Sequence, residues 1–214
     1  MSKADRLYII GGIRERETSV SVEVIDPAGA VKRLPMTKKL WERYAFSSGD
    51  TVTPETFGMM LADSQRCEAV TRALGYLKAA PLSYKGLHMK LKTAGCSDDA
   101  ADAALALVRR KRLIDEETQA ADIAEAQVRL KKRGRGRVVM YLQSKGYSAE
   151  IARRGADSVD EELYRAALKD AIFKKCRGVV PRDKAQRDKL IASIVRQGFS
   201  VGEIIKEMNT PEDD

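Results

Sequence analysis

The hydrophobic positions of this 214-residue chain follow two different periods. Near the N-terminus apolar and polar positions alternate, as in Ser19–Ile25, and a period of two is typical of a half-buried strand. Leu7–Ile10 and Ala30–Leu34 predict two further strands, and Asp26–Gly29 has the residues of a tight turn. We therefore expect residues 1–62 to form a small β-meander with added helices, which is too small to hold much core alone and should pack on the segment that follows.

From about residue 66 the apolar positions recur every three or four residues, which indicates amphipathic helices. One sequence motif, which we call the repeated phrase, occurs three times at the end of such a helix. It consists of an apolar residue, three further residues, glycine, a hydrophobic or cysteine residue, and serine. The glycines of the three copies, Gly95, Gly146 and Gly198, lie 51 and then 52 residues apart. Glycine ends a helix at little cost because it adopts left-handed backbone, and the serine can cap the next helix. The near-constant spacing predicts tandem repeats rather than three unrelated corners.

Each repeat is expected to contain three helices. The predicted fold is mainly α, a tandem array of three three-helix, helix-turn-helix-like repeats preceded by the β unit. We place the repeats at 63–115, 116–160 and 161–209, with a disordered tail over 210–214. The predicted helices are Thr37–Tyr44, Thr53 towards Cys67, Ala69–Ala79, one capped by Ser83, Asp98–Arg110, Thr118–Lys132, Arg137–Lys145, Ala149–Val159, Glu161–Lys175, one from about Pro181–Asp183 to Gln197, and Val201–Met208.

Composition argues against several classes of protein. No apolar run approaches the ~20 residues that span a bilayer, and the N-terminus lacks the features of a signal peptide. The cysteines Cys67, Cys96 and Cys176 are scattered, which favours free thiols in a reducing cytoplasm over a disulfide framework or a zinc site. His88 is the single histidine, and there is no Gly-Lys-Ser/Thr phosphate loop. The sequence therefore predicts a cytoplasmic protein with no catalytic residues, no metal and no cofactor.

The net charge of +8 is unevenly spread. Residues 66–157 carry 19 basic against 11 acidic side chains, whereas residues 158–214 carry 11 of each. The densest stretch, 131–137, has five basic residues out of seven, and its two glycines could let a partner approach closely. This pattern predicts a contact with phosphates or acidic side chains. The candidate residues are Arg109, Arg110, Lys111, Arg112, Arg129, Lys131, Lys132, Arg133, Arg135, Arg137, Arg153 and Arg154.

Structural explanations compete with this interpretation. A basic turn can simply be solvated, and the cations of 109–112 suit the C-terminal end of a helix dipole. Arg153 and Arg154 stand early in a helix, where cations are disfavoured, so they point more towards binding.

The stretch from 73 to 148 resembles the bacterial RecX family of regulators of the RecA recombinase. The resemblance rests on an acidic turn, a helix, a basic Gly-x-Gly segment and a Leu-x-x-Lys-Gly end, here Leu113–Glu117, Arg129, Gly134–Gly136, Leu142 and Lys145–Gly146. It extends more weakly over the rest of the chain. The family often has Arg around 80 and 82, Glu near 86 and Arg-Tyr after the acidic turn. This chain instead has Ala80, Leu82, Gly86 and Thr118-Gln119.

The resemblance implies a helical array lodged in the groove of a RecA–DNA filament. Such a protein would contact RecA and, through the filament, single-stranded DNA, or DNA directly. It would inhibit the ATPase, recombinase and SOS co-protease activities of RecA, as a monomer without enzymatic activity. The residues themselves predict a basic helical array, but they do not identify RecA as its partner. A helix-turn-helix-type protein acting on duplex or single-stranded DNA is the alternative, and a hydrolase in the N-terminal unit is a weaker one because no nucleophile–base pair is present.

Overall fold

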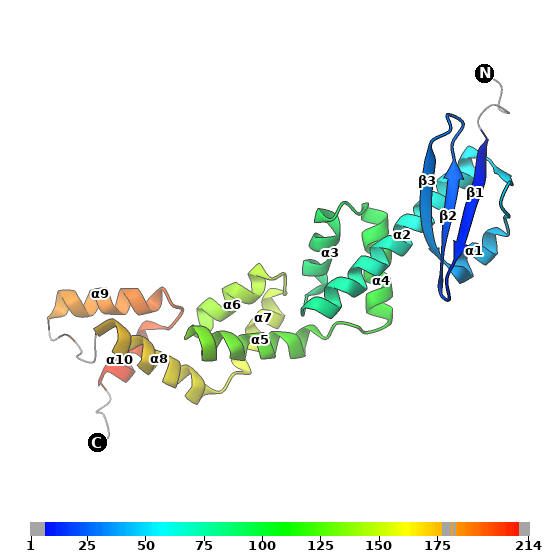
Figure 1. Cartoon of the computed structure of the whole chain (residues 1–214). Helices are drawn as coiled ribbons and strands as arrows, with labels where there is room; N and C mark the ends of the chain where they lie inside the picture. The colour runs from blue at the N-terminus through cyan, green and yellow to red at the C-terminus, as the bar shows by residue number, and fades with distance from the viewer. Residues whose placement is uncertain (1–6, 177–180, 182, 210–214) are drawn as a thin grey trace. The chain divides into compact units, whose positions relative to one another are not determined.

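The structure is a computed structural model that describes residues 7–176, 181 and 183–209, so the tail expected at 210–214 lies outside the described residues. It is mainly helical, with a small antiparallel sheet at the N-terminus (Figure 1). The chain divides into two compact units. Unit 1 comprises the described residues of 1–80 and 87–113, and unit 2 those of 81–86 and 114–214.

The sheet of unit 1 has four antiparallel strands in the order β3-β2-β1-β4. The alternating segments form β1 (Tyr8–Glu15), β2 (Ser19–Ile25) and β3 (Val31–Thr37), which confirms the predicted meander. A register shift interrupts the pairing of β1 with β2 between Ile10 and Ile13, where two glycines stand. The fourth strand, β4 (Thr51–Val52), was not predicted because two residues are too few to show a period.

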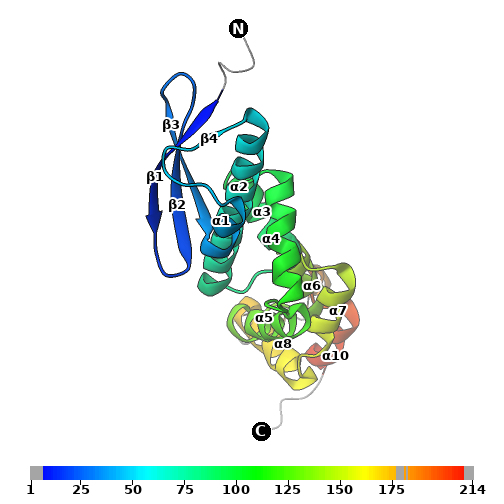
Figure 2. The ribbon, with the colours of Figure 1, turned by 90° about the vertical axis from the view of Figure 1, so that its right-hand side faces the viewer.

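Two helices cover one face of this sheet (Figure 2). Thr37 caps α1 (Lys38–Tyr44), and Thr53 caps α2 (Pro54–Ala79), which has proline in its first turn. Both helices pack on the inward side chains of the strands, and this core consists of residues of the predicted N-terminal unit itself. The two helices predicted over 53–79 are one continuous helix, because no glycine or proline interrupts the chain near Cys67. Our proposed domain boundary at 62/63 therefore lies inside α2.

The remaining helices begin and end within a few residues of the predicted helices. They are α3 (Tyr84–Thr93), α4 (Asp98–Arg110), α5 (Glu116–Lys131), α6 (Arg135–Ser144), α7 (Ala149–Asp157), α8 (Glu161–Cys176), α9 (Lys184–Val195) and α10 (Val201–Asn209). Two N-termini were misplaced. Asp115 caps α5 by accepting a bond from the Thr118 amide, and Gly134 is the N-cap of α6.

The repeated phrase folds as its chemistry predicts. Gly95, Gly146 and Gly198 have φ values of +83°, +93° and +96°, the left-handed region in which glycine ends a helix. The Oγ atoms of Ser97 and Ser148 accept bonds from backbone N–H groups three residues on. The third copy is a full capping box, because the Ser200 amide also donates to the Glu203 carboxylate over 2.7 Å.

Small residues bring the helices of unit 2 close together. A Cβ atom added to Gly155 of α7 would lie 2.9 Å from the Ala120 Cβ atom of α5, so only glycine fits at this crossing. Ala124, Ala152 and Ala156 are fully buried in the same core. This packing fixes α5 and α7, which carry several of the basic side chains singled out from the sequence.

Candidate partner-binding surface

The basic junction predicted to bind a partner joins α5 to α6 in unit 2. Helix α5 ends at Lys131, and Lys132 takes left-handed backbone with φ +51°. The Lys132 amide donates to the Val128 carbonyl over 3.0 Å, which closes the last turn of the helix. Arg133 follows, and Gly134 then opens α6. The junction is therefore a tight, hydrogen-bonded turn rather than an open loop.

The two glycines of this junction contact another part of the same unit. The amide of Gly134 donates to the Gln197 carbonyl over 2.9 Å, and that of Gly136 donates to the Gly198 carbonyl over 3.1 Å. A Cβ atom at Gly134 would lie 2.4 Å from the Gly198 carbonyl carbon. We expected these glycines to admit an external partner, but they admit the turn between α9 and α10. Two amides at the start of α6 are thus already used and cannot bind an anion.

The preceding turn of unit 2 makes a similar contact. The Ser83 hydroxyl donates to the Lys145 carbonyl over 2.8 Å and accepts a bond from the Gly86 amide. A Cβ atom at Gly146 would lie 2.7 Å from the Ser83 Oγ atom. In both places a glycine turn ends the second helix of a repeat, α6 or α9. The turn packs against the N-terminal end of the second helix of the preceding repeat, which is α3 or α6 respectively.

Five of the twelve candidate side chains have partners within unit 2. Arg135 is the most deeply engaged: its guanidinium donates to Glu161 over 2.9 Å and lies over the Tyr164 ring, 4.8 Å from its centroid. Its Nε atom is 3.1 Å from an Asp157 oxygen but lacks hydrogen-bond geometry. Burial acts to lower the pKa of Arg135, but the hydrogen bond to Glu161 and the nearby carboxylates outweigh it and raise the pKa above its ordinary value. We conclude that Arg135 holds α6 to α8.

Two other junction cations contact neighbouring side chains. Arg133 donates to the Gln127 side chain over 2.8 Å and lies 4.9 Å from the centroid of the Tyr141 ring. Lys132 is 3.4 Å from an Asp170 carboxylate oxygen of α8. These contacts limit the freedom of both side chains to meet a partner.

Ion pairs also hold two candidate arginines on the helices beside the junction. Arg129 pairs with Glu125 one turn earlier in α5. Arg154 bridges Glu150 of its own helix, at 2.8 Å, and Glu117 of α5, at 3.2 Å. Because these pairs are exposed, each contributes little to stability and could be exchanged for a partner's acid.

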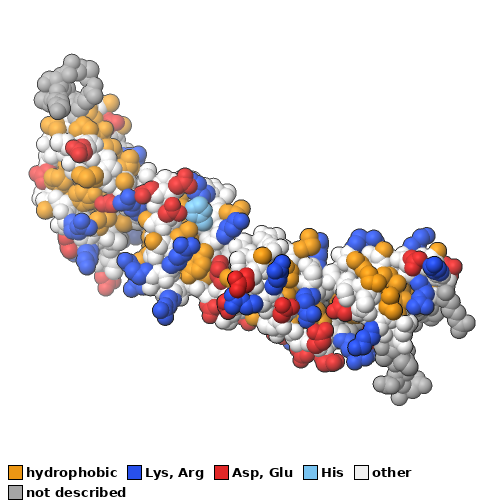
Figure 3. All heavy atoms as spheres, turned by 180° about the vertical axis from the view of Figure 1, so that it is seen from behind, with side chains coloured by type: hydrophobic (Ala, Val, Ile, Leu, Met, Phe, Trp, Pro, Cys, Tyr) orange, Lys and Arg blue, Asp and Glu red, His pale blue; other side chains and the backbone are white. Residues whose placement is uncertain are grey.

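The remaining candidates are more accessible. Arg109 takes part in a further interaction. Within the described ranges, six of the twelve candidate side chains are exposed and have no ion pair or hydrogen bond. We call them the free cations: Arg110, Lys111 and Arg112 in unit 1, and Lys131, Arg137 and Arg153 in unit 2. The face drawn in Figure 3 shows Lys and Arg interspersed with Asp and Glu. This face is therefore not uniformly basic.

A groove in unit 2 is lined by candidate cations and by one cation that the sequence did not single out. The groove has a volume of about 830 Å³ and lies between α6 and the α9–α10 turn. Arg137 lines it together with Arg196, the C-cap residue of α9. Arg196 escaped notice because it is isolated in sequence and becomes a neighbour of Arg137 only through the docking of the Gly198 turn.

Comparison of the sequence with known proteins gives two relatives and no matching family model. The regulatory protein RecX of Prosthecochloris aestuarii is 28% identical over 141 residues, which cover 65% of this chain and 90% of the relative. That of Corynebacterium efficiens is 27% identical over 149 residues, covering 66% of this chain and 70% of the relative. Both relatives are named regulatory protein RecX, so about two thirds of this chain is similar in sequence to that family.

Solved RecX structures have the same fold. The crystal structure of a regulatory protein RecX matches 95% of this chain and 100% of its own, with a TM-score of 0.74 and 17% identity. RecX from Lactobacillus salivarius matches 67% of this chain and 94% of its own, with a TM-score of 0.61 and 18% identity. The predicted fold class, a mainly helical array behind a small strand unit, is confirmed.

Three of the residues at which this chain departs from the RecX pattern have local roles. Gly86 is needed because a Cβ atom there would lie 3.0 Å from the Lys145 carbonyl oxygen. The Thr118 hydroxyl donates to the Asp115 carboxylate over 2.8 Å at the start of α5. Gln119 accepts a bond from the Tyr147 hydroxyl over 3.1 Å. Repeat packing and helix capping therefore account for these residues.

The other residues of this chain that could carry catalytic or metal-binding chemistry lie in structural surroundings. The cysteines are free and half-buried, as expected, and burial raises the pKa of the Cys67 thiol, which lowers its reactivity. His88 lies 3.5 Å from an Asp102 oxygen. Lys92 lies beside Asp98 at the start of α4 and lowers the pKa of that carboxyl through a hydrogen bond. Among the described residues no group of His, Cys, Asp or Glu could hold a metal ion.

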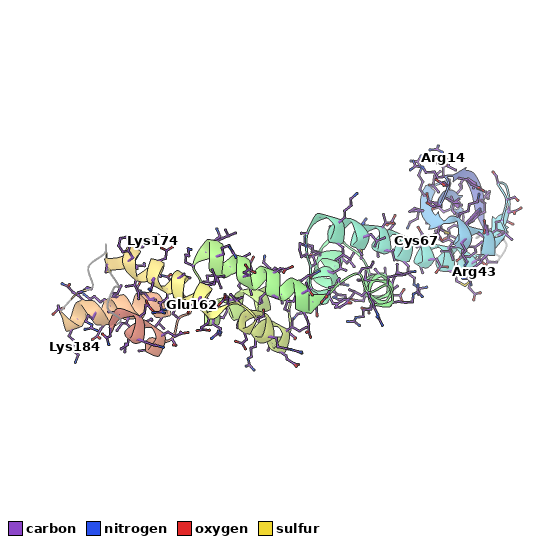
Figure 4. All side chains as sticks on the ribbon, turned by 90° about the horizontal axis from the view of Figure 1, so that it is seen from below. Arg14, Arg43, Cys67, Glu162, Lys174 and Lys184 are labelled. Carbon is purple, nitrogen blue, oxygen red and sulfur yellow. The ribbon has the colours of Figure 1, made fainter. Side chains whose placement is uncertain are left out.

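The charges of α8, the first helix of the third repeat, suit the helix dipole. The helix begins with Glu161 and Glu162 and ends with Lys174 and Lys175, so each charge lies at the favourable end (Figure 4).

No helix in the described part of the chain is long and apolar enough to cross a membrane.

Proposed function

We propose that this protein is a non-enzymatic, cytoplasmic regulator that binds the RecA–DNA filament and inhibits the ATPase, recombinase and SOS co-protease activities of RecA. The observation that carries the proposal is its similarity in sequence to proteins named regulatory protein RecX, over about two thirds of its length. It would act as a monomer in recombination and DNA repair, without a cofactor.

The free cations of unit 2 are proposed to make the electrostatic contacts with the filament. Lys131, Arg137 and Arg153 are exposed and unpaired among the described side chains, so binding a partner costs them no internal interaction. Arg135, by contrast, would have to leave Glu161 and Tyr164. A filament offers both DNA phosphates and acidic protein side chains, and guanidinium groups bind either.

The test is an assay of the DNA-dependent ATPase of RecA titrated with this protein. We expect inhibition at protein concentrations well below that of RecA. The triple variant Lys131→Gln, Arg137→Gln and Arg153→Gln should inhibit more weakly. At about 0.2–1 kcal/mol for each exposed charge contact, the loss is roughly 0.6–3 kcal/mol, or a threefold to about 150-fold higher concentration for half-inhibition.

A matched control removes the same charge from exposed lysines of the third repeat. Lys175→Gln, Lys184→Gln and Lys189→Gln should inhibit like the unaltered protein. Equal losses in both triple variants would mean that only net charge matters, and no inhibition by the unaltered protein would contradict the proposed function. Tight, steeply salt-dependent binding to naked DNA without an effect on RecA would instead indicate the DNA-binding alternative.

A further inference from the structure

The groove between α6 and the α9–α10 turn of unit 2 combines exposed apolar and basic side chains. Met140 of α6 is 59% exposed, and Val195 at the end of α9 is 40% exposed. Phe199 also lines the groove but is 4% exposed, so its ring belongs to the core. Two apolar side chains thus remain in solvent beside Arg137 and Arg196.

The charges that the groove can offer are two guanidinium groups. Arg137 and Arg196 are exposed and have no ion pair within the described part of the chain. The third arginine at the groove, Arg135, is held by Glu161. The Glu203 carboxylate accepts the bond from the Ser200 amide that completes the capping box, so it stays in place beside the groove.

We propose that this groove binds an acidic protein segment that carries an apolar side chain. Its carboxylates would pair with Arg137 and Arg196, and its apolar side chain would cover Met140 and Val195. Carboxylates match the two-pronged donor geometry of arginine, and burying the exposed methionine adds a hydrophobic contribution that charge alone does not supply. The inference rests on the proposed function, since the segment would belong to the protein component of the filament.

Three features of the groove favour a protein segment over nucleic acid. Amides at the start of α6 donate to the carbonyls of 197 and 198, so they form no cradle for a phosphate. Met140 and Val195 expose apolar surface, which an apolar side chain can cover but a phosphate backbone cannot. The groove also lacks an exposed aromatic ring for stacking a base, because its one ring, that of Phe199, is buried.

The test uses site-specific photo-crosslinking with the full chain. Met140→p-benzoylphenylalanine places an apolar crosslinker in the groove, and the same change at Lys189 places one on α9, outside the groove. Each variant is irradiated with RecA filaments assembled on an end-labelled oligonucleotide. We expect the crosslinker at 140 to capture RecA, at a peptide that mass spectrometry shows to contain Asp or Glu beside apolar residues.

Charge variants then test the two arginines. Adding Arg137→Gln and Arg196→Gln should lower the crosslinking yield at 140 at least threefold, whereas Lys184→Gln with Lys189→Gln should leave it unchanged. Capture of the labelled DNA, or of a second copy of this chain, would overturn the inference, as would an unchanged yield in the arginine variant.

The same samples separate this inference from the proposed function. If the protein inhibits RecA but the crosslinker at 140 captures no RecA, the groove assignment fails and the function stands. If the protein neither binds nor inhibits RecA filaments, both fail.

Discussion

Substitution of each of the three glycines of the repeated phrase tests how the repeats are held together. Each has left-handed backbone, so replacing any of them with alanine introduces the same conformational penalty, about 1–2 kcal/mol. Their surroundings differ. A Cβ atom at Gly95 meets nothing within 4 Å, one at Gly146 would lie 2.7 Å from the Ser83 Oγ atom, and one at Gly198 would lie 2.3 Å from the Arg137 amide nitrogen.

These distances predict an order of destabilisation. Gly95→Ala should lower the free energy of unfolding by the backbone penalty alone, about 1–2 kcal/mol. Gly198→Ala should add an overpacking cost of about 1–3 kcal/mol, because the atoms it meets are backbone atoms of α6 that cannot rotate away. Its total is therefore roughly 2–5 kcal/mol. Gly146→Ala should fall between the two, since part of its contact is with a side-chain hydroxyl.

The measurement is urea unfolding followed by two signals. Trp41, the single tryptophan, is buried in unit 1 and reports on Gly95→Ala through its fluorescence. Circular dichroism at 222 nm follows the helices of unit 2 for the other two variants. Gly134→Ala separates the two costs: its φ of −74° suits alanine, but the new Cβ atom would lie 2.4 Å from Gly198. Equal losses at Gly95 and Gly198, or no loss for Gly134→Ala, would refute the argument that these turns are rigidly docked.

Two further predictions concern stability. Burial raises the pKa values of Tyr147 and Tyr164 to about 12, so their contribution is complete below pH 10, the ordinary tyrosine pKa, and is lost as pH rises from 10 to 12. Unfolding titrations of unit 2 should show a decline of about 1.4 kcal/mol per pH unit for each tyrosine, and Tyr164→Phe should reduce that slope. Gly75 lies inside α2 with open space around its Cβ position, so Gly75→Ala should raise the stability of unit 1 by about 0.5–1 kcal/mol, measured by Trp41 fluorescence, and a decrease would contradict this.

The sequence predicted the fold well because its signals were local. A glycine followed by a hydrophobic residue and a serine determines both the end of one helix and the start of the next, and this chemistry does not depend on distant residues. The alternation in β2 was equally sufficient to identify a strand. The strand that was missed, β4, depends instead on a distant part of the chain. The two residues of β4 are ordered by pairing with β1, and neither shows this on its own.

The candidate binding site was harder to predict, because tertiary contacts decide whether a charged side chain is paired within the protein or is free to bind a partner. Arg135 and Arg137 are two residues apart in the same Gly-Arg-Gly-Arg stretch, and composition treats them alike. The fold places Glu161 and Tyr164 beside Arg135 and leaves Arg137 in solvent. Likewise, Arg196 carries no signal in sequence, and only the docked turn brings it to the same groove as Arg137.

The docking of glycine turns also gives the repeats a direction. A turn docks where the second helix of the preceding repeat begins with small or hydroxyl residues, such as Ser83 and Gly86, or Gly134 and Gly136. The third repeat differs at the corresponding place, because Asp183 caps α9 and the first turn of that helix has no glycine. The docking of the Gly198 turn uses amides at the start of α6, which leaves arginine side chains rather than backbone donors as the means of recognising a partner.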